Sequence, residues 1–178
     1  AKNFLLVLQH PVTTEYGSAK FQVSQTLNAI KKVGIQTIWL WPNIDAGTDH
    51  ISSVLRKFRE KNRNFLIRFF KNFHPEEYIK ILSNCSCVIG NSSSAIREGS
   101  FLGVPAVNVG SRQSGREMGE NVINTNYCKD EIVEAINIQM NKKKISKNKL
   151  YGDGKASKRI AKILGEININ IQKKLSYK

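Results

Sequence analysis

The chain has 178 residues, of which 40% are hydrophobic and 24% charged, values typical of one globular domain with its own core. No apolar run reaches the roughly 18 residues that cross a membrane. The first apolar run, residues 4–8, is too short for a signal peptide, so we expect a cytoplasmic protein with no membrane partner. The chain begins without Met and within one strand of a fold, which suggests a domain of a longer protein.

The net charge of +14 is concentrated near the C-terminus. Residues 141–178 contain 12 of the 28 basic side chains and 2 of the 14 acidic ones. Basic tails can bind nucleic acid or anionic lipid. This one lacks regularly interleaved aromatic residues and any recognised nucleic-acid module. We therefore interpret it as a solvated lysine-rich surface and expect no nucleic-acid partner.

The three cysteines, Cys85, Cys87 and Cys128, form neither a disulfide framework nor a zinc-binding set. Cys85 and Cys87 lie two apart at a strand start and are expected to be buried thiols. An odd number of cysteines fits a reducing compartment. We expect no metal site.

Strands and helices alternate along almost the whole chain. The predicted strands are residues 4–8, 35–41, 65–70, 88–89 and 106–107. One predicted helix includes residues 23–30 and stops at Gly34, and another begins at Pro75. The other predicted helices are residues 51–60, 95–102 and 132–140, with one or two more within 156–175. Continuous apolar runs are typical of strands covered on both faces. The pattern predicts an α/β fold with a Rossmann-like, doubly wound parallel sheet.

In such a sheet, ligands bind outside the carboxyl ends of the strands. The unusual polar clusters of the chain all follow predicted strands. They are residues 10–15, 42–49, 73–74, 91–94 and 110–117. This convergence predicts a binding site at that edge of the sheet.

The serine turn, Ser92-Ser93-Ser94, stands between a strand and the start of a predicted helix. Free backbone N–H groups, hydroxyls and the helix dipole at such a point suit a phosphate group. Glu98 follows about one and a half turns later, where a carboxylate can accept hydrogen bonds from a sugar diol. An ordinary capped helix is the alternative interpretation.

Three further residues follow strand ends. His10 can donate to a diphosphate or protonate a leaving phosphate oxygen, although a lone histidine is usually structural. Asn43 can bond a diphosphate or a sugar, or simply stabilise a turn. Arg112 lies in a loop between two glycines, and its guanidinium fork matches phosphate oxygens.

Several classes of function compete. A sugar-nucleotide enzyme accounts for the serine turn, Glu98 and the arginine loop together. A dinucleotide-dependent oxidoreductase needs Gly-x-Gly-x-x-Gly where His10 and Pro11 stand. A nucleic-acid-binding module explains the charge but not the polar clusters. A serine hydrolase needs a closing glycine that the serine turn lacks.

Five blocks of sequence together resemble the UDP-N-acetylglucosamine 2-epimerase family, in family order from about residue 4 to residue 165. They are residues 10–15, 41–47, 91–98, 103–121 and 151–154. The arginine loop, residues 111–117, resembles the hydrolysing branch, which releases UDP and N-acetylmannosamine for sialic acid synthesis. Relatives in that branch act on bacillosamine-type sugars for legionaminic acid.

The resemblance implies two Rossmann-like domains with the substrate between them, as in type-B glycosyltransferases. This chain matches the C-terminal half, so residues 1–165 are expected to form a UDP-binding domain and residues 166–178 a C-terminal helix or tail. The implied partners are a UDP-sugar and the N-terminal domain of the same enzyme, in a homo-oligomer. The resemblance implies no cofactor.

The resemblance also implies roles for seven residues. They are His10 and Asn43 on the diphosphate side, Phe73 through its backbone at the uracil, Ser92 and Ser93 at phosphate, Glu98 at the ribose hydroxyls, and Arg112 at UDP. His10 is also the implied catalytic residue. The family reaction eliminates UDP to a glycal and then adds water with inversion at C2. The acids that move the C2 proton are expected on the N-terminal half, so this chain alone is expected to be inactive. A non-hydrolysing epimerase and a type-B glycosyltransferase remain alternatives.

Overall fold

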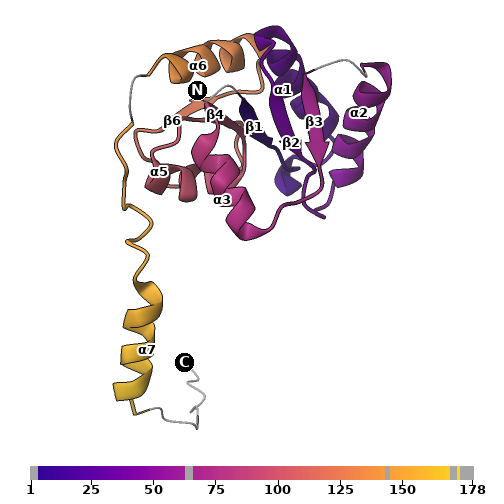
Figure 1. Cartoon of the computed structure of the whole chain (residues 1–178). Helices are drawn as coiled ribbons and strands as arrows, with labels where there is room; N and C mark the ends of the chain where they lie inside the picture. Colours follow the sequence, from indigo (N-terminus) through magenta and orange to yellow (C-terminus); the bar gives the residue numbers. More distant parts are fainter. Residues whose placement is uncertain (1–3, 63–65, 143–144, 169–171, 173–178) are drawn as a thin grey trace.

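The computed structural model of the chain describes residues 4–62, 66–142, 145–168 and 172 (Figure 1). The strands are β1 (Leu5–Leu8), β2 (Thr37–Leu40), β3 (Ile67–Phe70), β4 (Cys87–Gly90), β5 (Ala106–Val109) and β6 (Val122–Thr125). The helices are α1 (Ala19–Val33), α2 (Thr48–Lys61), α3 (Pro75–Asn84), α4 (Ser93–Ile96), α5 (Glu98–Leu102), α6 (Lys129–Asn141) and α7 (Ala156–Glu166), with a 3-10 turn at Thr13–Glu15.

The six strands form one parallel sheet in the order β3-β2-β1-β4-β5-β6. The chain runs outward from β1 to β3 and then returns to the other side of β1 at β4. This reversal makes the β1–β4 boundary the topological switch point of a Rossmann-like fold. Leu8 pairs with Leu40 on one side and with Gly90 on the other, so these strands end at the same level. The predicted fold class is confirmed.

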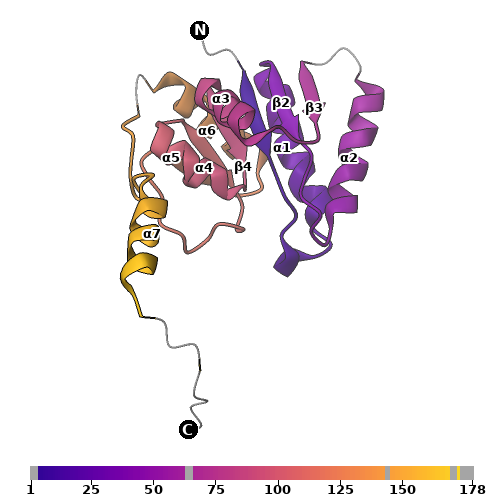
Figure 2. The same cartoon turned by 60° about the horizontal axis from the view of Figure 1, so that its bottom comes forward.

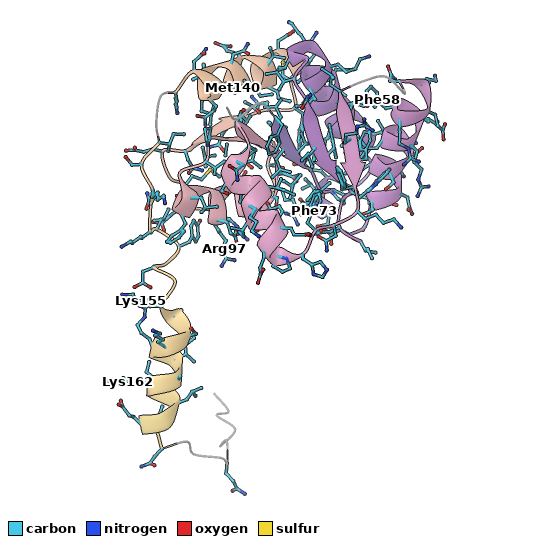
Figure 3. The ribbon with its side chains drawn as sticks, in the orientation of Figure 1. Phe58, Phe73, Arg97, Met140, Lys155 and Lys162 are labelled. Atoms are coloured by element: carbon cyan, nitrogen blue, oxygen red, sulfur yellow. The ribbon has the colours of Figure 1, made fainter. Side chains whose placement is uncertain are left out.

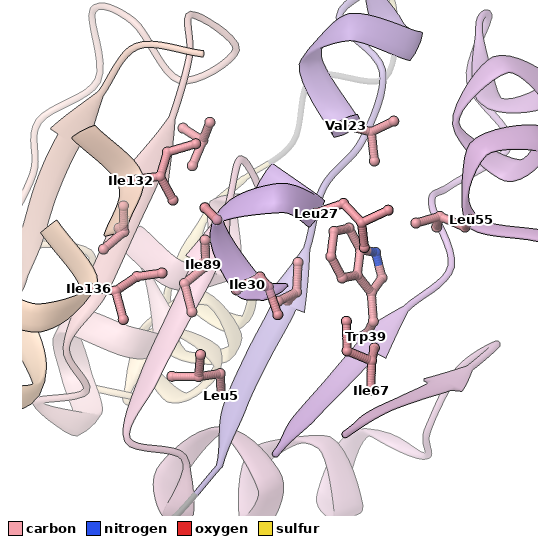
Figure 4. Close-up of a cluster of buried hydrophobic side chains, with 14 of the residues drawn as sticks. Leu5, Val23, Leu27, Ile30, Trp39, Leu55, Ile67, Ile89, Ile132 and Ile136 are labelled. Carbon is pink, nitrogen blue, oxygen red and sulfur yellow. The ribbon is translucent and has the colours of Figure 1, made fainter. Parts of the chain in front are cut away.

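The core has two layers because both faces of the sheet are covered. Alternate residues of β1 point to opposite faces: Leu5 and Val7 join the layer under α1, α2 and α6, whereas Leu6 and Leu8 join the layer under α3, α4 and α5. Figure 4 shows the first layer, where Trp39 lies among side chains from α1, α2 and β3. The two layers hold the strand ends in fixed positions.

The structure differs from the prediction at three places. The helix expected over residues 95–102 is divided at Arg97 into α4 and α5. The edge strand β6 was not predicted, and its side chains are half-buried or exposed. The helical region expected over residues 156–175 contains α7, which ends at Glu166; residues 169–171 and 173–175 lie outside the described part of the chain. Cys85 and Cys87 are buried, as predicted.

Helix α7 lies below the rest of the domain in Figure 1 and at its lower left side in Figure 2, and none of its residues is buried. Ile160, Ile163, Leu164 and Ile167 are all more than half exposed. Their spacing places them along one face of the helix. Figure 3 labels Lys155 and Lys162 at the start and along the length of α7. No helix in the described part of the chain is long and apolar enough to cross a membrane.

Candidate nucleotide-binding site

The loops after β1 and β4 are joined by Asn91, whose side chain is fully buried. The backbone N–H of His10 donates to Asn91 Oδ1 at 2.7 Å, and Asn91 Nδ2 donates to the His10 carbonyl at 2.8 Å. Gly90 has φ +128°, and a Cβ there would lie 2.0 Å from the Leu8 carbonyl oxygen. Only glycine allows β4 to approach β1 this closely before Asn91 turns toward His10.

The arginine loop after β5 also meets Asn91. The Asn91 carbonyl accepts hydrogen bonds from Gln113 Nε2 at 2.7 Å and from Arg112 Nη1 at 3.3 Å. Arg112 Nη2 lies 3.6 Å from an oxygen of Asp45, which belongs to the loop after β2. The loops that follow β1, β2, β4 and β5 are therefore connected through polar contacts, as the positions of the clusters in the sequence predicted.

His10 is 6% exposed, and its Nδ1 accepts a hydrogen bond from the backbone N–H of Asn43 at 3.1 Å. Burial is the main cause that lowers the pKa of His10 from 6.5 to about 4. The positive charge of Arg112 acts in the same direction, and the negative charge of Asp45 opposes it. The ring is therefore neutral at neutral pH, with its proton on Nε2. Nε2 donates to no acceptor in the described part of the chain and remains available to a ligand.

A pocket of about 490 Å3, here called the serine pocket, opens beside His10. Its lining residues are Leu8, His10, Leu40, Trp41, Pro42, Asn43, Ile44, Lys71, Asn72, Tyr78, Ser92 and Ser94. None of these is an Asp or a Glu. The Ser92 hydroxyl oxygen accepts from the Ser94 N–H at 3.4 Å, which leaves the hydroxyl hydrogen of Ser92 to donate. The pocket thus offers several hydrogen-bond donors and suits a ligand rich in acceptor oxygens.

A second pocket of about 330 Å3, here called the Glu98 pocket, is lined by Glu98 and by Ile79 of α3. The two pockets share no lining residue, but the charge of Glu98 acts on Tyr78, which lines the serine pocket. Glu98 Oε2 is buried and has no hydrogen-bond partner in the described part of the chain. A buried carboxylate oxygen without a partner is costly, and a donor from a ligand would remove that cost. A sugar diol supplies such donors.

Three of the predicted residues, Ser93, Phe73 and Arg112, line neither pocket. Ser93 is the first residue of α4, between Ser92 and Ser94. Phe73 is half-buried beside the core layer under α3, with its ring centroid 5.0 Å from that of Phe70. Figure 3 shows Phe73 and Arg97 on the same lower edge of the domain. Because α4 is only four residues long, the helix dipole expected at the serine turn is weak.

Two residues of the site were not predicted from the sequence. Asn91 and Gln113 are buried, and they connect the loops that carry His10 and Arg112. Both lie inside the polar clusters that the sequence marked. Within the described part of the chain, no group of three or more His, Cys, Asp or Glu side chains could hold a metal ion.

Known proteins of similar sequence include epimerases of UDP-sugars. The sequence pattern of the family described as "UDP-N-acetylglucosamine 2-epimerase" matches residues 1–165. A UDP-N,N'-diacetylbacillosamine 2-epimerase (hydrolyzing) of Legionella pneumophila is 36% identical over 171 residues, which are 96% of this chain and 45% of that protein. A UDP-N-acetylglucosamine 2-epimerase of Neisseria meningitidis is 35% identical over 135 residues, 76% of this chain and 35% of that protein.

Solved structures show the same fold. The UDP-GlcNAc 2-epimerase of Methanocaldococcus jannaschii, in complex with UDP-GlcNAc and UDP, superposes with a TM-score of 0.68 at 20% identity. The match covers 92% of this chain and 45% of that one. This chain thus spans less than half the length of the relatives that it matches. With residues 1–165 matched by the family pattern, the chain belongs to the UDP-N-acetylglucosamine 2-epimerase family.

Proposed function

We propose that this chain is the UDP-binding domain of a hydrolysing UDP-N-acetylglucosamine 2-epimerase, or of a relative that acts on a UDP-diacetamido sugar. The whole enzyme would release UDP and the free sugar epimerised at C2. The observation that carries the proposal is a donor-rich serine pocket with the Glu98 carboxylate near its Tyr78. The donors suit a diphosphate, and the buried, unpartnered Oε2 of Glu98 suits a ribose diol.

Each predicted residue takes a role in this proposal. His10 Nε2, Asn43, the serine turn at Ser92 and Ser93, and Arg112 bind the diphosphate, Glu98 binds the ribose hydroxyls, and the backbone at Phe73 contacts the uracil. Arg112 is held by the Asn91 carbonyl and Asp45, so its guanidinium is fixed beside His10 before a ligand arrives. Fixed donors stabilise the negative charge that UDP gains as it leaves.

His10 is the catalytic residue of this chain in the proposal. With Nδ1 engaged by the Asn43 N–H, the ring presents Nε2–H to the serine pocket. A neutral donor stabilises the departing phosphate oxygen through its Nε2–H, and the negative charge of the bound diphosphate favours a protonated ring, which can pass a proton to that oxygen. Abstraction of the C2 proton needs a base near the sugar. The serine pocket has no carboxylate in its lining, so we assign that base to another part of the enzyme.

A second domain, N-terminal to this one, is part of the proposal. The chain covers 45% of the Legionella relative, and α7 carries three exposed apolar side chains on one face, with a fourth at Ile167 directly after it. Such a face gains stability when another surface covers it. We propose residues 1–165 as the nucleotide-binding domain and residues 166–178 as a C-terminal extension, in an enzyme that assembles as a homo-oligomer.

Product analysis of a longer protein that contains this domain tests the proposal. The enzyme is incubated with UDP-N-acetylglucosamine or UDP-N,N'-diacetylbacillosamine and followed by NMR. UDP together with a free epimerised sugar supports the hydrolysing reaction, whereas a UDP-linked epimer supports the non-hydrolysing alternative. Absence of both products, with transfer of the sugar to an acceptor, would support a glycosyltransferase. Residues 1–178 alone should release no UDP, because one domain cannot enclose the sugar.

A further inference from the structure

Ser94 is a serine-turn residue to which the proposed function gives no role. Its hydroxyl forms a hydrogen bond with the phenolic hydroxyl of Tyr78, which reaches it from α3. Both side chains are half-buried, and both line the serine pocket together with Ser92 and His10. The pair therefore connects α3 to the turn that is proposed to bind phosphate.

The two hydroxyl groups carry two hydrogens, and their mutual bond uses only one. A phenol is a stronger acid than an aliphatic alcohol, so Tyr78 is the better donor and Ser94 the acceptor. Burial raises the pKa of Tyr78 to about 12, and the charge of Glu98 acts in the same direction while the bond to Ser94 opposes it. Tyr78 therefore keeps its hydrogen at neutral pH and can donate it to Ser94 Oγ.

The hydrogen of the Ser94 hydroxyl is then free to serve another acceptor. Serines in helices often donate to the carbonyl four residues earlier, but in the described part of the chain Ser94 makes no such bond. The serine pocket has no carboxylate in its lining to accept this hydrogen. Because hydrogen bonds in a chain polarise one another, the bond from Tyr78 makes Ser94 a stronger donor.

We propose that Ser94 is a further phosphate-binding residue of the serine pocket and that Tyr78 is its positioning residue. The inference rests on the proposed function, because it assumes that a nucleoside diphosphate occupies this pocket. Ser94 donates to a phosphate oxygen beside Ser92 and His10. Tyr78 does not need to touch the ligand, since it acts by holding the Ser94 hydroxyl in the donating rotamer.

The test is calorimetric titration of the 178-residue chain with UDP and, separately, with uridine. Ser94→Ala should lower the affinity for UDP about tenfold or more, the usual loss of a hydrogen bond to a charged group, and leave the affinity for uridine unchanged. Ser94→Cys, which keeps the size but donates weakly, should behave similarly. Ser24→Ala is the matched control, because the Ser24 hydroxyl donates only to a backbone carbonyl on the exposed face of α1.

Tyr78→Phe separates positioning from a general structural role. It should lower the affinity for UDP about three- to tenfold without changing the affinity for uridine, because the Ser94 hydroxyl remains but is no longer oriented. Combined with Ser94→Ala, it should cause no further loss, since it acts only through Ser94. Tyr16→Phe serves as control, because Tyr16 is 70% exposed and lines neither pocket.

The outcomes distinguish the two proposals. A wild-type chain that does not bind UDP refutes the proposed function. A wild-type chain that binds UDP, with Ser94→Ala and Ser94→Cys binding it equally well, overturns the inference about Ser94 alone. Equal losses for UDP and uridine, or a further loss from Tyr78→Phe in the Ser94→Ala background, overturn the positioning role of Tyr78.

Discussion

The free energy of unfolding should depend on pH through His10. The imidazole of the unfolded chain takes up a proton near pH 6.5, whereas that of the folded chain does so only near pH 4. Between these values the unfolded chain binds more protons, so acidification destabilises the fold. Each tenfold change in proton affinity corresponds to about 1.4 kcal/mol, and the lowering of this pKa therefore corresponds to roughly 3 kcal/mol. That stability is fully present above pH 6.5 and is lost as the pH falls toward 4.

Urea unfolding of the wild type and of His10→Asn, at several pH values from 4 to 7.5, measures this effect. The Oδ1 of asparagine keeps an acceptor for the Asn43 N–H but takes up no proton in this range. Other titrating groups contribute equally to both proteins, so the difference between them should change by about 3 kcal/mol across the window. A constant difference, or a His10 pKa near 6.5 measured by NMR, would refute the account of a buried neutral donor.

Three further predictions concern the ligand and the switch point. Arg112→Lys should weaken UDP binding about tenfold in calorimetry, because an ammonium cannot contact Asn91, Asp45 and a phosphate as a fork does; unchanged affinity would remove Arg112 from the site. Glu98→Ala should weaken UDP binding about tenfold to a hundredfold but leave pyrophosphate binding unchanged, and equal effects on both ligands would contradict the ribose role. Gly90→Ala should lower the free energy of unfolding by about 3 kcal/mol or more, because its Cβ would meet the Leu8 carbonyl. Gly115→Ala, with no atom within 4 Å of the added Cβ, should cost only about 1–2 kcal/mol in the same urea titration.

The elements with strong local patterns were predictable from the sequence. The apolar run of β1 and the entry to α3 are examples: Pro75 begins that helix, and the Glu77 carboxylate accepts the His74 N–H at 3.3 Å. The edge strand β6 was missed because its four residues are only partly covered and show no buried run. The break at Arg97 was missed because residues 95–102 have no proline there to mark the end of a helix.

The location of the site was predictable, but its internal contacts were not. The rule that ligands bind at the carboxyl ends of parallel strands selected loops that the structure connects through polar contacts. The hydrogen bonds between Asn91 and His10 join residues 81 apart in the sequence, and they depend on the register of β4 against β1. The pairing of Tyr78 with Ser94 depends in the same way on how α3 packs beside the serine turn. Spacing along the chain carries no information about such contacts.

The central claim is that a nucleoside diphosphate binds with its diphosphate in the serine pocket and its ribose at Glu98. The most direct measurement is NMR mapping of backbone amides in the 15N-labelled chain during titration with UDP and with uridine. We expect UDP to shift the amides of Asn43, Ser92, Ser93 and Arg112, and uridine to leave these four largely unchanged while it shifts those near Phe73. Binding of UDP without shifts at these four amides, or with shifts confined to other parts of the chain, would contradict the claim.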